Sequence, residues 1–152
     1  MKKITKIIAL ALTLMLALSS FIACKPESDP EGEVTLVVAG DTTEVFTVGI
    51  SEIEGEKNVL SLVEHLKNEG KLDYKTDSTG YFTEIGSVKQ NPDEGKYVGI
   101  WTSVESDFDD ASIYTTTKTY EGVTVKSSAY GAEKMTLKDG AVIYFSYLIY
   151  EF

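Results

Sequence analysis

The chain has very few of the residues from which enzymes and metal centres are usually built. Its 152 residues include one cysteine, one histidine, one tryptophan and no arginine. A single cysteine excludes an internal disulfide, so stability must come from a hydrophobic core. The sequence has no Cys and His cluster for a transition metal and no glycine-rich phosphate loop. Because these signatures of catalysis are missing, we expect a protein that is not an enzyme.

Positive charge is also scarce after the first part of the chain. Residues 24–152 contain 11 lysines and 24 acidic residues, which gives a net charge of −13. Phosphates of nucleic acids are bound by clustered Lys and Arg, so a nucleic acid is not an expected partner. The same charge opposes direct binding to anionic lipids. A link to a membrane would therefore have to be a covalent lipid.

The first 23 residues have the layout of a signal peptide. Three lysines among the first six residues precede an apolar run at residues 7–18, which only Thr13 interrupts. Such a run is too short to cross a hydrocarbon core of about 30 Å comfortably as a helix. We therefore exclude residues 1–23 from the fold.

The end of this segment, Ser19-Ser20-Phe21-Ile22-Ala23-Cys24, contains the only cysteine of the chain. It resembles the lipobox of bacterial lipoproteins, in which the cysteine is lipidated on its sulfur and becomes the new N-terminus. The resemblance implies lipidation of Cys24 and a protein anchored by lipid on the extracytoplasmic side of the cell membrane. The alternative is an ordinary secretory signal, which would leave a free thiol on an exported chain. Residues 24–32 hold two of the three prolines and are expected to form a flexible tether.

Residues 33–152 are expected to form one domain with a single core. Two β-branched runs, at residues 34–39 and 44–50, are separated by a short polar turn and predict a β-hairpin. An apolar stripe at helical spacing follows, with Asn58 as its N-cap and Gly70 at its end. The stripe consists of Val59, Leu60, Leu62, Val63 and Leu66. These signals predict one helix of about three turns.

The single histidine, His65, lies beside this stripe and is expected to be a helix-flank residue rather than a ligand. The chain then returns to residues typical of strands. Candidate strands cover residues 81–88, 97–104, 112–119, 123–128 and 141–150. This order predicts an α+β domain with one helix laid across a mixed or antiparallel sheet. Both faces of the last strand are partly apolar, so we expect the second face to be covered as well.

Four segments in this layout are similar to the transcobalamin-like C-terminal domain family, found in bacterial surface lipoproteins and in the vertebrate vitamin B12 carriers. They are the helix start Asn58-Val59-Leu60-Ser61-Leu62-Val63, the segments 80–88 and 97–103, and the closing segment 131–147. The resemblance covers residues 34–147 and implies a β-grasp-like sheet crossed by one helix. It makes cobalamin a candidate ligand, while no resident cofactor is expected. In the vertebrate carriers the domain closes over cobalamin together with a large helical domain that these 152 residues do not contain.

The candidate binding site lies on the central aromatic strand. Tyr97, Gly99, Trp101 and Ser103 alternate along one face of this strand. The glycine would leave a gap between two rings, where a flat ligand or a side chain of a partner could lie. The alternative is that Trp101 belongs to the core. Other aromatic side chains that could grip a ring, a sugar or a partner are Tyr81, Phe82, Tyr114, Tyr120, Tyr130, Tyr144, Tyr147 and Tyr150.

The acidic segment at residues 105–110 alternates carboxylates in a way that could bind Ca²⁺ through oxygen atoms. It lacks the glycine turn and the terminal glutamate of an EF-hand loop. A solvated loop is favoured, and no metal site is expected.

Two functional hypotheses remain. The first is a surface-anchored binding module that captures a small molecule, such as a corrinoid, or engages another cell-envelope protein. The second is a structural adhesion or spacer domain of the cell envelope, without a small-molecule ligand.

Overall fold

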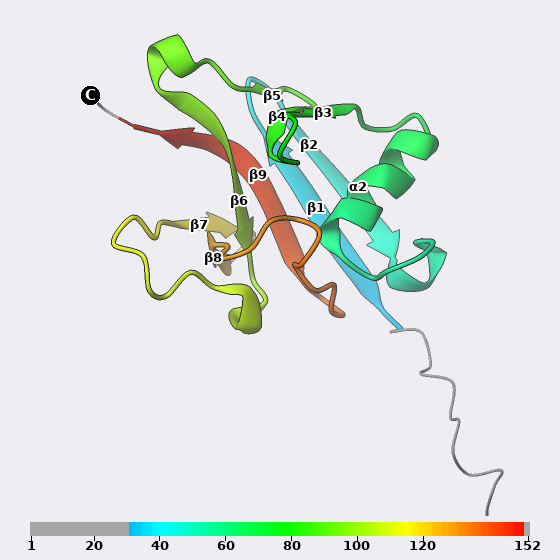
Figure 1. Ribbon diagram of the computed structural model, residues 1–152. Coiled ribbons are helices and arrows are strands. Elements are labelled where there is room, and N and C mark those ends of the chain that lie inside the picture. The colour runs from blue at the N-terminus through cyan, green and yellow to red at the C-terminus, as the bar shows by residue number, and fades with distance from the viewer. Residues whose placement is uncertain (1–30, 151–152) are drawn as a thin grey trace, which may run out of the picture.

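The structure of the chain is a computed structural model that describes residues 31–150. The predicted signal peptide, the lipidation site Cys24 and nearly all of the predicted tether lie outside the described residues. The described residues form a six-stranded sheet in the order β2-β1-β9-β6-β8-β7 and a second sheet of three short strands (Figure 1). The strands of the larger sheet are β1 (Glu33–Ala39), β2 (Thr43–Gly49), β6 (Lys96–Thr102), β7 (Thr117–Tyr120), β8 (Val123–Ser127) and β9 (Val142–Ile149).

The larger sheet is mixed. β1 and β9 run parallel, while every other pair of neighbours runs antiparallel. The last strand, β9, lies inside the sheet between β1 and β6. The predicted α+β class is confirmed, with a mostly β structure and one helix across a mixed sheet.

The first hairpin is confirmed as predicted. β1 and β2 are paired along their whole length, from Glu33 opposite Gly49 to Ala39 opposite Thr43. The turn that joins them begins at Gly40, where a Cβ atom would lie 2.5 Å from the carbonyl group of Ser87. Glycine is required there because the backbone of a second turn packs directly against this one.

The predicted helix is also confirmed. Helix α2 (Val59–Asn68) begins at Asn58, whose side chain accepts a hydrogen bond from the Ser61 N–H at 2.9 Å. It ends before Gly70, which adopts a left-handed φ of 69°. The buried side chains are Val59, Leu62, Val63 and Leu66, and Leu60 is partly buried against the same core. No helix within residues 31–150 is long and apolar enough to span a bilayer.

The expected strand at residues 81–88 is wrong in one respect. It is a hairpin of two short strands, β4 (Phe82–Ile85) and β5 (Val88–Lys89), because Gly86 turns the chain at a positive φ. A third strand, β3 (Tyr74–Thr76), pairs with β4 and was not predicted. The small sheet packs through Phe82 and Ile85 into the same core as the helix.

The expected strand at residues 112–119 is wrong over its first half, because β7 begins only at Thr117. Residues 112–116 form a loop in which hydroxyl groups bond to the backbone: Thr115 Oγ1 donates to the carbonyl of Ser112 at 2.8 Å. Three 3₁₀ turns complete the described elements: η1 (Ile50–Glu52), η2 (Pro92–Glu94) and η3 (Glu105–Asp107).

The two faces of the large sheet carry separate clusters of buried side chains. The larger cluster lies between the sheet and the layer formed by α2 and the small sheet. The smaller one lies on the second face and comprises Val37, Trp101, Val125 and Val142, one from each of β1, β6, β8 and β9. The Nζ atom of Lys118, in β7, lies 4.5 Å from the centre of the Trp101 ring, so this end of the sheet curls over the second face. The chain itself therefore buries this cluster on the second face, in line with the apolar pattern of the last strand.

Candidate ligand-binding groove

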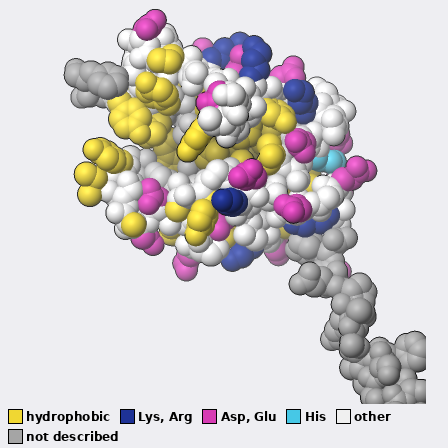
Figure 2. All heavy atoms as spheres, in the orientation of Figure 1, with side chains coloured by type: hydrophobic (Ala, Val, Ile, Leu, Met, Phe, Trp, Pro, Cys, Tyr) yellow, Lys and Arg dark blue, Asp and Glu magenta, His cyan; other side chains and the backbone are white. Residues whose placement is uncertain are grey.

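Two adjoining hollows, of about 420 and 330 Å³, lie beside the small sheet and the free edge of β6. Six residues line both hollows, so we treat them as one groove. The shared residues are Gly80, Tyr81, Phe82, Ala129, Tyr130 and Gly131. We call it the aromatic groove because Tyr74, Tyr81, Phe82, Trp101, Tyr114, Tyr130 and Tyr150 line it. Figure 2 shows hydrophobic side chains gathered across a hollow of the molecular surface.

Four tyrosines of the groove are unusually exposed. The relative exposure is 73% for Tyr81, 68% for Tyr114, 48% for Tyr130 and 41% for Tyr150. They come from four different segments: the β3–β4 turn, the loop before β7, the loop after β8 and the end of β9. Large apolar surfaces that converge in this way on a concave site are typical of binding sites.

The turn that carries Tyr81 is held by one carboxylate. Asp77 Oδ1 accepts hydrogen bonds from the Thr79 N–H at 2.8 Å, the Thr79 hydroxyl at 2.6 Å and the Tyr81 N–H at 3.1 Å. These donors, led by the Thr79 hydroxyl, lower the pKa of Asp77 below its usual value. The turn is therefore ordered, and Tyr81 is presented by a fixed backbone rather than by a loose loop.

The loop that carries Tyr130 is fixed at both ends. Its start is held by Ser128, whose Oγ accepts from the Tyr130 N–H at 3.1 Å and donates to the Tyr130 carbonyl at 3.0 Å. Its far end is joined to the first turn of α2, where the Leu60 N–H donates to the Ala132 carbonyl at 3.1 Å. Asn58 adds a bond from its Nδ2 to the Glu133 carbonyl at 3.0 Å. One wall of the groove is thus attached directly to the helix.

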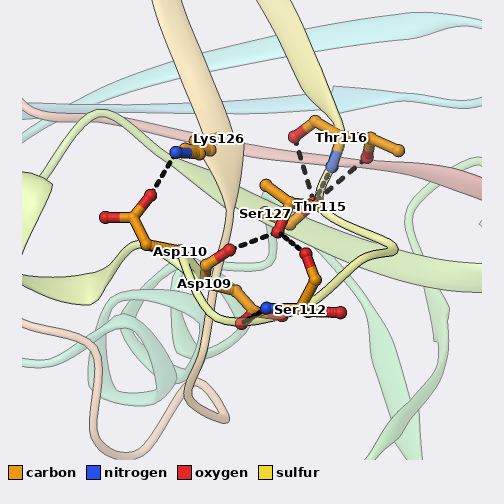
Figure 3. A network of polar contacts seen from close by, with 7 residues as sticks. All are labelled: Asp109, Asp110, Ser112, Thr115, Thr116, Lys126 and Ser127. Carbon is orange, nitrogen blue, oxygen red and sulfur yellow. Dashed lines mark hydrogen bonds and ion pairs between the residues drawn. The ribbon is translucent and has the colours of Figure 1, made fainter.

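The loop that carries Tyr114 is organised by a polar network around the start of β7 and the end of β8 (Figure 3). Asp109 Oδ1 accepts from the Ser112 N–H at 3.1 Å, and the Thr115 hydroxyl donates to the Asp109 carbonyl. Ser127 Oγ accepts from the Thr116 N–H at 2.9 Å. An ion pair between Lys126 and Asp110 completes the network shown in the figure.

The charge of the groove is negative on balance. Its lining includes the carboxylates of Glu64, Asp109 and Glu133 and one ammonium group, that of Lys134. Burial, with a smaller contribution from the Glu64 carboxylate, raises the pKa of the Tyr74 hydroxyl. Carboxylates beside exposed tyrosine rings favour a neutral or cationic ligand over an anion.

The four residues of the predicted site do not all lie in the groove. Gly99 and Trp101 line the groove, but Trp101 is only 2% exposed, and its Nε1–H donates to Thr116 Oγ1 at 2.9 Å. The expected gap over Gly99 is wrong, because a Cβ atom there would lie 2.4 Å from the Trp101 ring. The indole itself fills that space, since the strand turns its largest side chain back over its smallest residue.

Tyr97 and Ser103 lie at the two ends of the predicted site. The ring of Tyr97 packs edge-on against Tyr150 at a centroid distance of 5.7 Å and so supports the groove without lining it. Ser103 Oγ accepts from the Val142 N–H at 2.9 Å, and its side chain faces a different, shallow hollow. The structure therefore brings two of the four residues into the groove and a third into contact with it.

The solvated loop expected at residues 105–110 is wrong in part, because one of its carboxylates is built into the fold. Asp107 is buried, and its Oδ2 accepts from the Thr136 N–H at 2.8 Å, while Asp109 and Asp110 have the partners described above. No group of three or more metal-ligating side chains occurs in residues 31–150. His65 lies on the flank of the helix, with Nε2 3.4 Å from Glu69 Oε2.

Comparison with solved structures defines the class of fold. A Ruminococcus gnavus protein provisionally described as metal-binding aligns with 80% of this chain over 100% of its own length, at a TM-score of 0.50 and 14% identity. Haptocorrin in complex with Cbi aligns at a TM-score of 0.54 and 14% identity, over 86% of this chain and 28% of haptocorrin. No protein-family model and no curated protein sequence matches the chain. The chain is thus a small α+β domain whose fold is shared with a part of haptocorrin.

Proposed function

We propose that this chain is a membrane-anchored, extracytoplasmic binding module, and that the aromatic groove is its binding site. The observation that carries the proposal is the convergence of four exposed tyrosines, from four segments, on one hollow. The size of the two hollows lies in the range of small-molecule sites. Lipidation of Cys24 would supply the membrane link. The role is one of binding, without catalysis.

The construction of the groove supports this role. Rings held by ordered turns lose little conformational freedom when a ligand arrives, so more of the contact energy appears as affinity. Tyr81 and Tyr130 are both presented in this way, through Asp77 and Ser128. A spacer domain would have no need to hold apolar rings in water at fixed positions.

The chemistry of the lining selects a class of ligand. Tyrosine faces suit flat or ring-containing molecules, and the carboxylates favour a neutral or cationic one. A corrinoid is one candidate, supported by the resemblance of the sequence and by the fold shared with haptocorrin. The shared fold corresponds to 28% of the haptocorrin chain. If the ligand is a corrinoid, we therefore expect a second protein or domain to complete the binding site.

A thermal-shift screen tests the proposal on a soluble form beginning at Glu33. The panel contains cobalamin, flat heterocyclic cations, matched flat anions and aryl glycosides. We expect at least one neutral or cationic compound to raise the melting temperature in a dose-dependent way, by the equivalent of about 2.7 kcal/mol at a hundred times its Kd.

Variants place the compound in the groove. Tyr81→Ala and Tyr130→Ala should abolish the shift, while Val45→Thr, at an exposed position of β2 away from the groove, should keep it. If neither a compound of this panel nor a peptide ligand raises the melting temperature, the spacer hypothesis is favoured instead.

A further inference from the structure

One residue of β6 turns unpaired main-chain groups towards the aromatic groove. At the two ends of the β6–β9 ladder, the Ser103 N–H donates to the Val142 carbonyl and the Tyr150 N–H to the Gly95 carbonyl, each at 3.0 Å. In an antiparallel pair these bonds are made by alternate residues, so the odd-numbered residues of β6 face β9. The N–H and C=O of Val98 therefore point to the opposite edge of the strand.

The neighbours of Val98 along this edge are paired at Lys96 and at the carbonyl of Ile100. Lys96 exchanges two hydrogen bonds with Asn91, at 2.8 and 2.9 Å, and the Ile100 carbonyl accepts from the Ser128 N–H at 3.1 Å. Within residues 31–150, no group is found that bonds to the outward N–H or C=O of Val98. β8 pairs with β6 only from Trp101 onward. The edge is thus open at both main-chain groups of Val98 and at the N–H of Ile100, for which no partner is found within residues 31–150.

This opening lies in the wall of the groove. Val98, Gly99 and Ile100 line the same hollow as Tyr81, Tyr130 and Tyr150. An extended chain that bonds to Val98 would pass between these rings and would direct alternate side chains to its two sides. The carboxylate of Asp109 lies in the same hollow, and those of Glu64 and Glu133 line the adjoining one.

We propose that the aromatic groove takes an extended, basic peptide segment, which adds to β6 at Val98 as a short extra strand. The inference rests on the proposed function, in which the groove is the binding site, and it names the ligand class. One peptide residue would exchange both main-chain hydrogen bonds with Val98. Lysine or arginine side chains flanking that residue would contact the tyrosine rings and the carboxylates. Main-chain bonds provide affinity, and the charged flanks provide selectivity.

The test uses four capped peptides. The probe is acetyl-Lys-Val-Lys-Val-Lys-amide, and its charge control has glutamate in place of lysine. Two further peptides are N-methylated, one on the valines and the other on the lysines. Each therefore lacks the main-chain N–H groups along one of the two edges of the extended peptide. We expect the lysine probe to bind, the glutamate probe not to bind, and one of the two methylated peptides to lose about tenfold in affinity, which corresponds to one main-chain hydrogen bond.

A pair of protein variants tests the role of Val98 itself. Val98→Pro removes the outward N–H, at an edge position where proline is tolerated, and Val98→Thr keeps it with a similar shape. We expect Val98→Pro to bind the lysine probe about tenfold more weakly than Val98→Thr, because only the proline variant lacks the outward N–H. In the wild type, amide exchange at Val98 should slow when the probe binds. If the melting temperature of Val98→Pro lies well below that of the wild type, the variant is set aside. The methylated peptides and the amide exchange of the wild type then test strand addition without it.

The outcomes separate this inference from the proposed function. Equal binding to Val98→Pro and Val98→Thr, with no change in amide exchange, would mean that side chains alone hold the peptide, and the strand-addition proposal would be wrong. Binding of a flat compound without binding of any peptide would overturn this inference and leave the proposed function standing. Failure of the peptides and of the whole compound panel would overturn both.

Discussion

Trp101 shows how a residue can line a candidate site and still belong to the core. One edge of its ring reaches the groove, but the side chain is nearly buried among Val37, Val125 and Val142 and is covered by Lys118. Burial of its ammonium group lowers the pKa of Lys118. The groove is therefore built on part of the hydrophobic core, and the exposed tyrosines stand above that floor.

A substitution at Trp101 should affect stability first. We expect Trp101→Ala to lower the free energy of unfolding by about 3 to 5 kcal/mol, because it empties a packed space. Urea denaturation measures this loss, and in the wild type the fluorescence of the single tryptophan should be blue-shifted and resistant to quenching by acrylamide. Tyr114→Ala, at an exposed ring of the same groove, should change stability by less than about 0.5 kcal/mol. A stable Trp101→Ala protein with normal melting would contradict the burial described here.

The turn that presents Tyr81 to the groove should depend on pH through Asp77. Its pKa is lowered in the folded state, so its hydrogen bonds stabilise the turn above the ordinary value of 3.8 and are lost as the pH falls through the lower, folded pKa. We expect the amide signals of Thr79 and Tyr81 to titrate together in that acidic range, followed by NMR. In Asp77→Asn the amide oxygen still accepts hydrogen bonds but does not titrate, so this pH dependence should disappear while the turn remains. Unchanged titration in the variant would assign it to another carboxylate.

At the scale of elements, the first turn of α2 is joined to the wall of the groove. Asn58 caps the helix and also donates to the Glu133 carbonyl. Asn58→Ala should cost about 1 kcal/mol for the cap and about 1 kcal/mol more for the lost loop contact. Asn58→Ser should keep the cap and lose only the contact. Urea denaturation of both variants separates the two contributions, and equal stability of the two would show that the loop contact alone matters.

The elements that the sequence predicted are those with local signals. The β1–β2 hairpin has two long β-branched runs around a short turn, and α2 has a cap, an apolar stripe and a terminal glycine. The missed strand β3 has only three residues, too few for an alternation to be visible. Residues 112–116 have strand composition, but their hydroxyl groups bond to the local backbone and hold a loop instead.

The site was harder to predict than the fold. Its four exposed tyrosines were among the candidate aromatic residues and Tyr74 was missed, but strand alternation selected the face of Tyr97, Gly99, Trp101 and Ser103. The exposed rings come from loops and strand ends, where no periodicity applies. Their convergence depends on distant contacts, such as those that hold residues 128–132 beside the helix. The Asp77-Ser78-Thr79-Gly80 turn before Tyr81 is the one local signal that could have indicated a presented ring.

At the scale of the whole molecule, the anchoring hypothesis depends on a residue outside the described part of the chain. We expect Cys24→Ala to release the protein into the medium or to leave an unprocessed precursor, because the lipidated sulfur is missing. Fractionation followed by mass measurement distinguishes these results from the wild type. The substitution should leave the melting temperature of the domain unchanged, since the tether precedes β1. Mature-sized Cys24→Ala protein in the membrane fraction would overturn the hypothesis.

The position of β9 has a consequence for the order in which the molecule can assemble. β9 joins β1, near the start of the domain, to β6, and among the described strands no other bridges those two halves of the sheet. A chain made from its N-terminus therefore cannot close the sheet until residues 142–149 have left the ribosome. Pairing between segments about a hundred residues apart also closes slowly. The extracytoplasmic location that we propose requires export, and a sheet that stays open until its final strand arrives would keep the chain unfolded for longer during that step.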